Sequence, residues 1–264
     1  MYTNALHESL NPLNLIKLIK YKLAFKREHP DYFEPCGTAI FCGSQGSGKT
    51  LSGVNYCYRV LADFPHAILC TNTKMRDFPF NAHLDGERLI DNATGELITS
   101  DKILDGTFKN VCCEYSGLDC LKFINNGEYG VIFFIDEFHL ELNSLESKNV
   151  DIDVMIEISQ QRKQRKHIVG TSQIFERLAK PVREQIKDVI KCKCFFGCIQ
   201  WNKRLDGETA VEKNGKLTAD VKGRYLWFHN PDMYERYDTY QKMKRYNKEW
   251  NGRSRQPVQF FKEV

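Results

Sequence analysis

The chain has 264 residues, of which 42% are hydrophobic and 27% charged, and its formal net charge is +4. These values are ordinary for a globular protein, the net charge excludes a uniformly basic nucleic-acid binder, and the length suits one well-buried α/β domain with appendages. Because no apolar run approaches about 18 residues, we expect no membrane span.

Residues 1–35 are expected to form an N-terminal helical extension. Lysines intrude on its apolar arc, so we expect a helix that docks on the core or on a neighbouring subunit rather than one that contacts DNA or lies on a membrane. Lys17 and Lys20 also interrupt the apolar stretch, and we expect no signal peptide. The apolar residues at helical spacing are Leu13, Ile16, Ile19 and Leu23.

A phosphate-binding motif, G-x-x-x-x-G-K-[ST], directly follows an apolar run at residues 38–42 that predicts a strand. Its glycines allow the backbone to fold around phosphates, so that N–H groups and the next helix N-terminus face the anion. We expect Lys49 to reach the β- and γ-phosphates and the Thr50 hydroxyl to hold Mg²⁺. The predicted ATP-binding residues are Gly43, Ser44, Gln45, Gly46, Ser47, Gly48, Lys49 and Thr50.

A second strand, predicted at residues 131–135, runs straight into Asp136 and Glu137. Its unbroken apolar sequence indicates a strand buried on both faces of a parallel sheet, whose carboxyl end is where such sheets bind ligands. We expect Asp136, as the Walker-B carboxylate, to hold Mg²⁺ and Glu137 to polarise the water that attacks the γ-phosphate. The alternative chemistry is a kinase-type phosphoryl transfer. A GTPase is disfavoured, because the segment 202–206 has the wrong spacing for a guanine-binding motif.

Residues 156–166 predict a helix with an increasingly basic end, and residues 167–173 predict a strand beside the one that ends at Asp136. Polar residues at its tip are candidates for sensing the γ-phosphate: Gln173 first, then Thr171 and Ser172. Candidates for an arginine that acts on the neighbouring subunit's site are Arg162 and Arg165, with Arg183 third. The alternative for the basic residues is a solvated helix end.

The C-terminal part is predicted to hold a β-hairpin over residues 195–227 and a basic tail. Residues 241–264 carry seven basic against two acidic residues, which favours contact with a phosphate backbone, with a solubilising tail as the alternative. Ten cysteines, many in predicted strands, indicate a reducing cytoplasm. For Cys192, Cys194 and Cys198 both core packing and a metal site stay open.

Four segments together resemble the zonular-occludens-toxin-like (Zot-like) ATPases of the FtsK–HerA superfamily: the phosphate loop, residues 66–72, residues 135–139 with His139, and residues 161–173. The resemblance implies a RecA-like α/β fold with three layers, ATP and Mg²⁺, DNA as cargo, and a hexameric or pentameric ring with an arginine acting in trans. Filamentous-phage members carry a membrane span after this core, and none is visible in this sequence.

We therefore predict an N-terminal extension (1–35), a RecA-like P-loop NTPase core (36–200), and a hairpin with a basic tail (201–264). The predicted function is ATP-driven DNA translocation, most simply the packaging of a phage genome, with capsid or portal proteins as partners in the host cytoplasm or on the virion. The alternative is a filamentous-phage-type assembly or export ATPase that drives virion morphogenesis with membrane partners and without gripping DNA.

Overall fold

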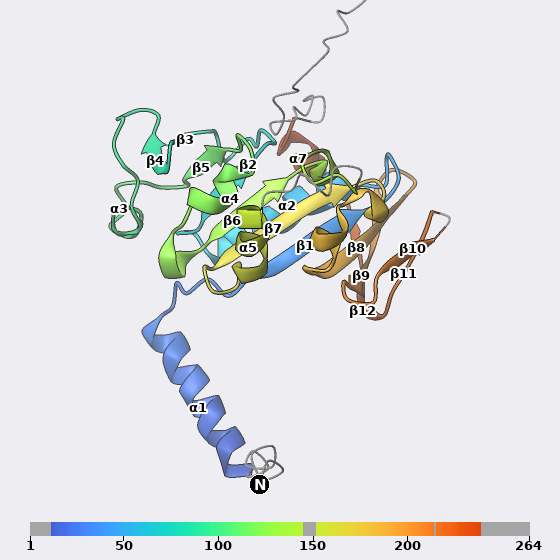
Figure 1. The fold of residues 1–264 in the computed structure, drawn as a ribbon, viewed down its shortest axis with the longest axis horizontal. Helices are drawn as coiled ribbons and strands as arrows, with labels where there is room; N and C mark the ends of the chain where they lie inside the picture. The colour runs from blue at the N-terminus through green and yellow to red at the C-terminus, as the bar shows by residue number, and fades with distance from the viewer. Residues whose placement is uncertain (1–11, 145–151, 214, 239–264) are drawn as a thin grey trace, which may run out of the picture.

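The computed structural model describes residues 12–144, 152–213 and 215–238. Within these ranges one large sheet has the strand order β12-β9-β8-β1-β7-β6-β2-β5-β3-β4 (Figure 1), and β10 and β11 form a separate two-stranded sheet. The strands are β1 Gly37–Cys42, β2 Ile68–Thr71, β3 Ala82–Asp85, β4 Arg88–Asp91, β5 Cys112–Glu114, β6 Val131–Ile135, β7 Lys166–Ser172, β8 Ile186–Phe195, β9 Ile199–Asp206, β10 Val211–Lys213, β11 Lys216–Thr218 and β12 Val221–Phe228.

Apart from α1, the helices of the described residues cover both faces of the sheet or lie at its ends. The helices are α1 Pro12–Glu28, α2 Lys49–Asp63, α3 Ser100–Leu104, α4 Asp119–Phe123, α5 Ile152–Gln160, α6 Lys180–Arg183 and α7 Pro231–Glu235, with single 3₁₀ turns at η1 Gly127–Tyr129, η2 Phe138–Leu140 and η4 Phe175–Arg177.

The centre of the sheet is parallel, and β7 lies between β1 and β6. The apolar runs of β1 and β6 are buried because their alternate side chains enter two different cores. On one face Phe41 and Phe134 pack with Val54 of α2; on the other, Ile40 and Phe133 belong to the core that includes α4, α5 and α6. These three layers confirm the predicted α/β, RecA-like fold.

The strands β8, β9 and β12 form one edge of the large sheet. β8 turns back into β9 and β9 pairs with β12, both in antiparallel fashion. The predicted C-terminal hairpin is therefore confirmed, and the small β10–β11 sheet lies between its arms in the chain. The division at residues 35 and 200 stays a prediction, and the predicted basic tail, residues 241–264, lies outside the described residues.

Helix α1 projects away from the sheet, as Figure 1 shows. Its apolar side chains are exposed, with Leu15 at 60% and Leu23 at 55%. The predicted N-terminal helix is thus present, but it does not pack on the core of its own chain. Of the residues that the structure describes, none belongs to a helix with the length and apolar character needed to cross a membrane.

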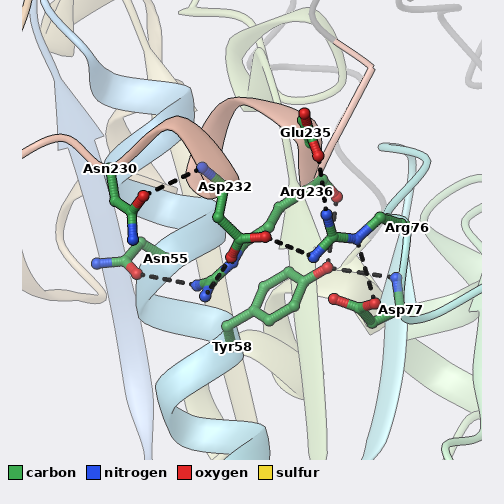
Figure 2. A network of polar contacts seen from close by, with 8 residues as sticks. All are labelled: Asn55, Tyr58, Arg76, Asp77, Asn230, Asp232, Glu235 and Arg236. Atoms are coloured by element: carbon green, nitrogen blue, oxygen red, sulfur yellow. Dashed lines mark hydrogen bonds and ion pairs between the residues drawn. The ribbon is translucent and has the colours of Figure 1, made fainter.

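The short helix α7 is fastened to α2 and to the turn after β2 by a network of polar contacts (Figure 2). The Arg236 guanidinium lies 4.7 Å from the Tyr58 ring centre and donates to Asn55 Oδ1 over 3.4 Å. Arg76 pairs with Asp232 at 2.9 Å, and its backbone N–H donates to the carbonyl of Arg236. The segment after β12 therefore crosses the outer side of α2.

The structure corrects the predicted helix over residues 156–166, because its basic end is not helical. Helix α5 ends at Gln160, and Arg165 adopts a left-handed backbone with φ 55°. Lys166 begins β7 and is only 2% exposed, because its ammonium donates to the Leu121 carbonyl (2.6 Å) and pairs with Glu157 (2.8 Å). Pairing in β7 outweighs helix propensity here, so the predicted basic end of this helix is wrong.

Candidate functional site

The loop between β1 and α2 has the geometry of a phosphate-binding loop. Gly46 and Gly48 have φ of 75° and 76°, a region that favours glycine, and a Cβ on Gly48 would also collide with the Gln200 side chain. The first amides of α2 have no partner within the helix, which makes its N-terminus attractive to an anion. The buried Ser47 hydroxyl has no hydrogen-bond partner among the described residues. The loop is therefore built to receive the oxygens of a polyphosphate.

Asp136 lies at the end of β6 and faces the start of α2 across β7. Its Oδ1 accepts from the Thr50 hydroxyl at 3.0 Å and from the Thr171 hydroxyl at 2.6 Å. The side chain is buried, and this burial raises its pKa above the ordinary value; Glu137 adds to the rise, whereas the two hydroxyls and Lys49 oppose it. A buried carboxylate beside a hydroxyl offers the hard oxygen donors that Mg²⁺ prefers. Thr50 and Asp136 thus fit a magnesium site.

Replacing Asp136 by asparagine is expected to stabilise the nucleotide-free protein at neutral pH. A folded-state pKa above the unfolded one means that the stability contribution of Asp136 is fully present below the unfolded pKa and is lost as pH rises. The melting temperature of the variant should therefore exceed that of the wild type near pH 7, and the two should converge in acid. The variant should also lose the extra melting-temperature rise that Mg²⁺ adds to ATP, and equal magnesium effects in both proteins would contradict the assignment.

Asn72, which follows β2, holds the backbone of Asp136 by a reciprocal pair of hydrogen bonds. Its Nδ2 donates to the Asp136 carbonyl, and its Oδ1 accepts from the Asp136 N–H, both at 2.9 Å. The next residue, Glu137, has φ 52°, and its N–H donates to Thr171 Oγ1 at 2.9 Å. Three neighbouring strands therefore fix the direction of the acidic pair.

The Glu137 carboxylate lies between a cation and an imidazole. Lys49 Nζ is 3.5 Å from its Oε1, and His139 Nδ1 is 3.3 Å from its Oε2. Burial lowers the pKa of His139 below its ordinary value, with Arg177 and Lys49 acting in the same direction and Glu137 against it. The hydrogen-bond partner of His139 Nδ1 is Ser172 Oγ at 3.4 Å, and Glu137 Oε2 has no hydrogen-bond partner among the described residues. The carboxylate is thus held beside the phosphate loop in a position to accept a proton.

The three sensor candidates of β7 have different positions. Thr171 contacts Asp136 and the Glu137 backbone directly, and Ser172 Oγ is 3.4 Å from His139 Nδ1 and donates to the Ile174 carbonyl. Gln173 lies just after β7 and is exposed. The structure therefore brings Thr171 and Ser172 into the site more closely than Gln173, whose sensing role stays a prediction.

The predicted trans arginines lie away from their own chain's phosphate loop. Arg162 and Arg165 precede β7, at the amino end of the parallel strands, while the loop is at the carboxyl end, about 20 Å away at 3.3 Å per strand residue. Arg165 stacks 4.0 Å from the Tyr32 ring centre. Arg183 lies 5.9 Å from the Phe175 ring centre. Arg177, which sequence reasoning missed, is the arginine that acts on the pKa of His139.

Hydrogen-bonded amide side chains, both buried, support the phosphate loop from strand β9. No pattern in the sequence predicted this contact. Gln200 Nε2 donates to the Ser47 carbonyl (2.9 Å) and to Asn202 Oδ1 (2.8 Å), and Asn202 Nδ2 donates to Ser52 Oγ (3.1 Å). His229 reaches Gln200 Oε1 at 3.2 Å. The strand β9 is thereby coupled to the phosphate loop by side chains that come together only in the fold.

The cysteine alternatives are also resolved in part. Cys192 is buried in the core under α2, Cys194 is half-buried and Cys198 is exposed. In the stretches of chain that the structure describes, no group of three or more His, Cys, Asp or Glu side chains is arranged to hold a metal ion.

No protein-family model and no curated protein match the sequence. Among solved structures, the N-terminal domain of zonular occludens toxin from Neisseria meningitidis is 14% identical with a TM-score of 0.48, over 77% of this chain and 100% of that one. The genome packaging NTPase of Sulfolobus turreted icosahedral virus 2 with ATP-gammaS is 14% identical with a TM-score of 0.42 (60% and 75%). The flagellar accessory protein FlaH from Methanocaldococcus jannaschii is 13% identical with a TM-score of 0.37 (71% and 89%). The likeness concerns the fold, and the functions of these proteins are not transferred with it.

Proposed function

We propose that the chain hydrolyses ATP at this site and uses the energy to move DNA. The observation that carries the hydrolysis is the meeting of Lys49, Glu137 and the Thr50–Asp136 pair at the carboxyl ends of β1 and β6. A cation, the carboxylate that pairs with it, and two hard oxygen donors lie together beside a loop suited to phosphate. This combination supports attack of water on a nucleoside triphosphate.

Each residue has one part in the proposed reaction. The loop amides and Lys49 bind the phosphates, while Thr50 and Asp136 hold Mg²⁺, which when bound draws negative charge from the phosphate oxygens. Glu137 Oε accepts a proton from the attacking water; His139 Nδ1 lies 3.3 Å from that carboxylate, and Thr171 Oγ1 holds the Glu137 backbone N–H.

The ion pair between Lys49 and Glu137 adds a control on the reaction. Lys49 Nζ lies 3.5 Å from the Glu137 carboxylate. An arriving triphosphate offers Lys49 several anionic oxygens, and the ammonium then turns to them. Glu137 is released for the water only when substrate is in place.

The DNA and the ring belong to the same proposal and are supported by the resemblance of the motifs to the Zot-like ATPases. We infer a homo-oligomeric ring in which Arg162 or Arg165 of one subunit completes the neighbour's site, because both lie at the sheet end opposite their own loop. Genome packaging with capsid or portal partners remains the simplest task for such a motor, whose location we infer to be the host cytoplasm or the virion.

The rate of ATP hydrolysis, measured with and without duplex and single-stranded DNA over a range of protein concentrations, tests this function. We expect DNA to stimulate the rate and the specific activity to rise with protein concentration as rings form. Mixing Glu137→Gln chains with Arg162→Ala or Arg165→Ala chains should restore activity above either alone, because some interfaces regain both groups. Activity that ignores DNA and concentration would contradict the motor, and stimulation only by membrane or coat proteins would favour the assembly ATPase.

A further inference from the structure

A cleft of about 1700 Å³ lies beside α2, over the outer strands β8, β9 and β12, with α1 and the segment after it as the far wall. In the part of the chain that the structure describes, seven lysine and arginine residues besides Arg162 and Arg165 line it against three aspartate and glutamate residues. The volume exceeds the roughly 300–1,000 Å³ typical of small-molecule pockets. The cleft therefore suits an extended ligand with many negative charges.

Two of its three acidic residues are already engaged by lining cations. Asp188 receives a bidentate pair from Arg204, at 2.9 and 2.7 Å, and also lies 3.5 Å from the ammonium of Lys222. Glu34 pairs with Lys26 at 3.4 Å. Because these two carboxylates are neutralised by neighbouring cations, little negative charge remains in the cleft to repel a polyanion.

Other cations of the lining have no acidic partner. Within the described residues, Lys22 of α1, Arg59 of α2 and Arg224 of β12 form no ion pair within 4 Å, and all three are exposed. They come from three different walls of the cleft. Unpaired cations on several walls around one space provide a track for phosphate groups, as in grooves that follow a nucleic-acid backbone.

Aromatic residues also line the cleft. Tyr225 of β12 is 42% exposed, Tyr21 of α1 is 66% exposed, and Trp227 of β12 is half-buried. Rings beside phosphate-binding cations match unpaired bases, whose flat faces stack on aromatic side chains. A fully paired duplex would leave these rings unused.

The cleft is connected to the phosphate loop through buried side chains. Tyr225 pairs with Asn202 across the β9–β12 ladder, and Asn202 donates to Ser52 of α2. Gln200, also fully buried, links Asn202 to the Ser47 carbonyl. A ligand on the strand side of the cleft is therefore two side chains away from the loop.

One competing occupant is disfavoured by charge. The α1 helix of a second copy would bring an apolar surface, but it carries lysines along its length and Lys26 and Arg27 in its last turn. Placed in a cleft with an excess of positive charge, it would be repelled.

We propose that this cleft binds a single strand of nucleic acid, with phosphates at Lys22, Arg59 and Arg224 and unpaired bases against Tyr21, Tyr225 and Trp227. The proposal rests on the proposed function for DNA as the cargo and adds the place and the strandedness of its binding.

Fluorescence anisotropy of a labelled 20-nucleotide oligothymidine, titrated with the full chain at several salt concentrations, tests the cleft. Arg59→Gln/Arg224→Gln should weaken binding about 20-fold at 0.1 M salt and lower the log–log salt slope by about 1.4, since each contact to a single strand contributes about 0.7. Tyr225→Leu should weaken binding about fivefold or more with an unchanged slope. The matched control is Arg88→Gln/Lys109→Gln, two exposed cations outside the cleft, which should bind like the wild type.

The possible outcomes distinguish failure of the proposed binding site from failure of the proposed ATP-driven motor. The proposal that nucleic acid binds in the cleft would be wrong if both cleft variants bound the oligonucleotide with wild-type affinity or if the control variant lost as much affinity as they did. It would also be wrong if polyglutamate competed with the oligonucleotide as well as unlabelled oligonucleotide does. Tighter binding of a duplex of the same length would contradict the proposed preference for a single strand. If the oligonucleotide binds through the cleft but leaves hydrolysis unchanged, the proposed motor fails and the cleft stands. If DNA stimulates hydrolysis equally in the wild type and the cleft variants, the motor stands and the cleft fails.

Discussion

Replacing Glu137 by glutamine is expected to lower the turnover number for ATP by about 10²-fold or more while ATP still binds. Glutamine keeps the size and can still face His139, but it cannot take the proton of the attacking water. The phosphate contacts of the loop and the Thr50–Asp136 pair remain. Steady-state hydrolysis and equilibrium binding of ATP, measured on the same preparation, separate the two effects.

Glu114→Gln is the matched control for this variant. Glu114 is an exposed carboxylate at the end of β5, two strands from β6 in the same sheet. The Glu114→Gln variant should hydrolyse ATP at the wild-type rate. Unchanged turnover in the Glu137 variant would remove this residue as the base and direct attention to the remaining acidic groups.

Replacing Lys49 by alanine is expected to act on binding itself, weakening ATP about 30-fold or more. The ammonium is buried with only 7% of the residue exposed, and truncating one partner of such a charge pair costs roughly 2–5 kcal/mol. The loss should appear in the dissociation constant of ATP measured by calorimetry. Lys180→Ala, an exposed lysine in α6, should leave it unchanged.

The thermal stability of the Lys49 variant adds an independent check. Lys49 forms an ion pair with Glu137, so its removal leaves this partly buried carboxylate with His139. We expect ATP to raise the melting temperature of the wild type much more than that of the variant. Equal shifts would mean that Lys49 does not hold the phosphates.

The sequence was informative where local chemistry decides the structure. The phosphate loop and the run before Asp136 each carry their signal in adjacent residues, since turn geometry needs glycines and a strand buried on both faces needs an unbroken apolar run. Their place in the sheet also followed from the rule that parallel strands bind ligands at their carboxyl ends. The strand order around β7 then brought Thr50 and Asp136 within 3.0 Å.

What could not be predicted depends on contacts between distant segments. The amide of Asn72 holds Asp136 from 64 residues away, and Gln200 supports Ser47 from 153 residues away. Nothing in their own neighbourhoods distinguishes them from surface amides. Lys166 was misplaced for the same reason, because its burial depends on carbonyls of α4, 45 residues earlier.

Displacement of streptavidin from the end of biotinylated DNA, single-stranded or duplex, tests the central claim that ATP hydrolysis at this site moves DNA. The account predicts ATP-dependent displacement by the wild type from at least one form of DNA, and none by Glu137→Gln although that variant still binds ATP. Hydrolysis by the wild type without displacement from either form of DNA would contradict the claim, and so would displacement that continues in the Glu137→Gln variant.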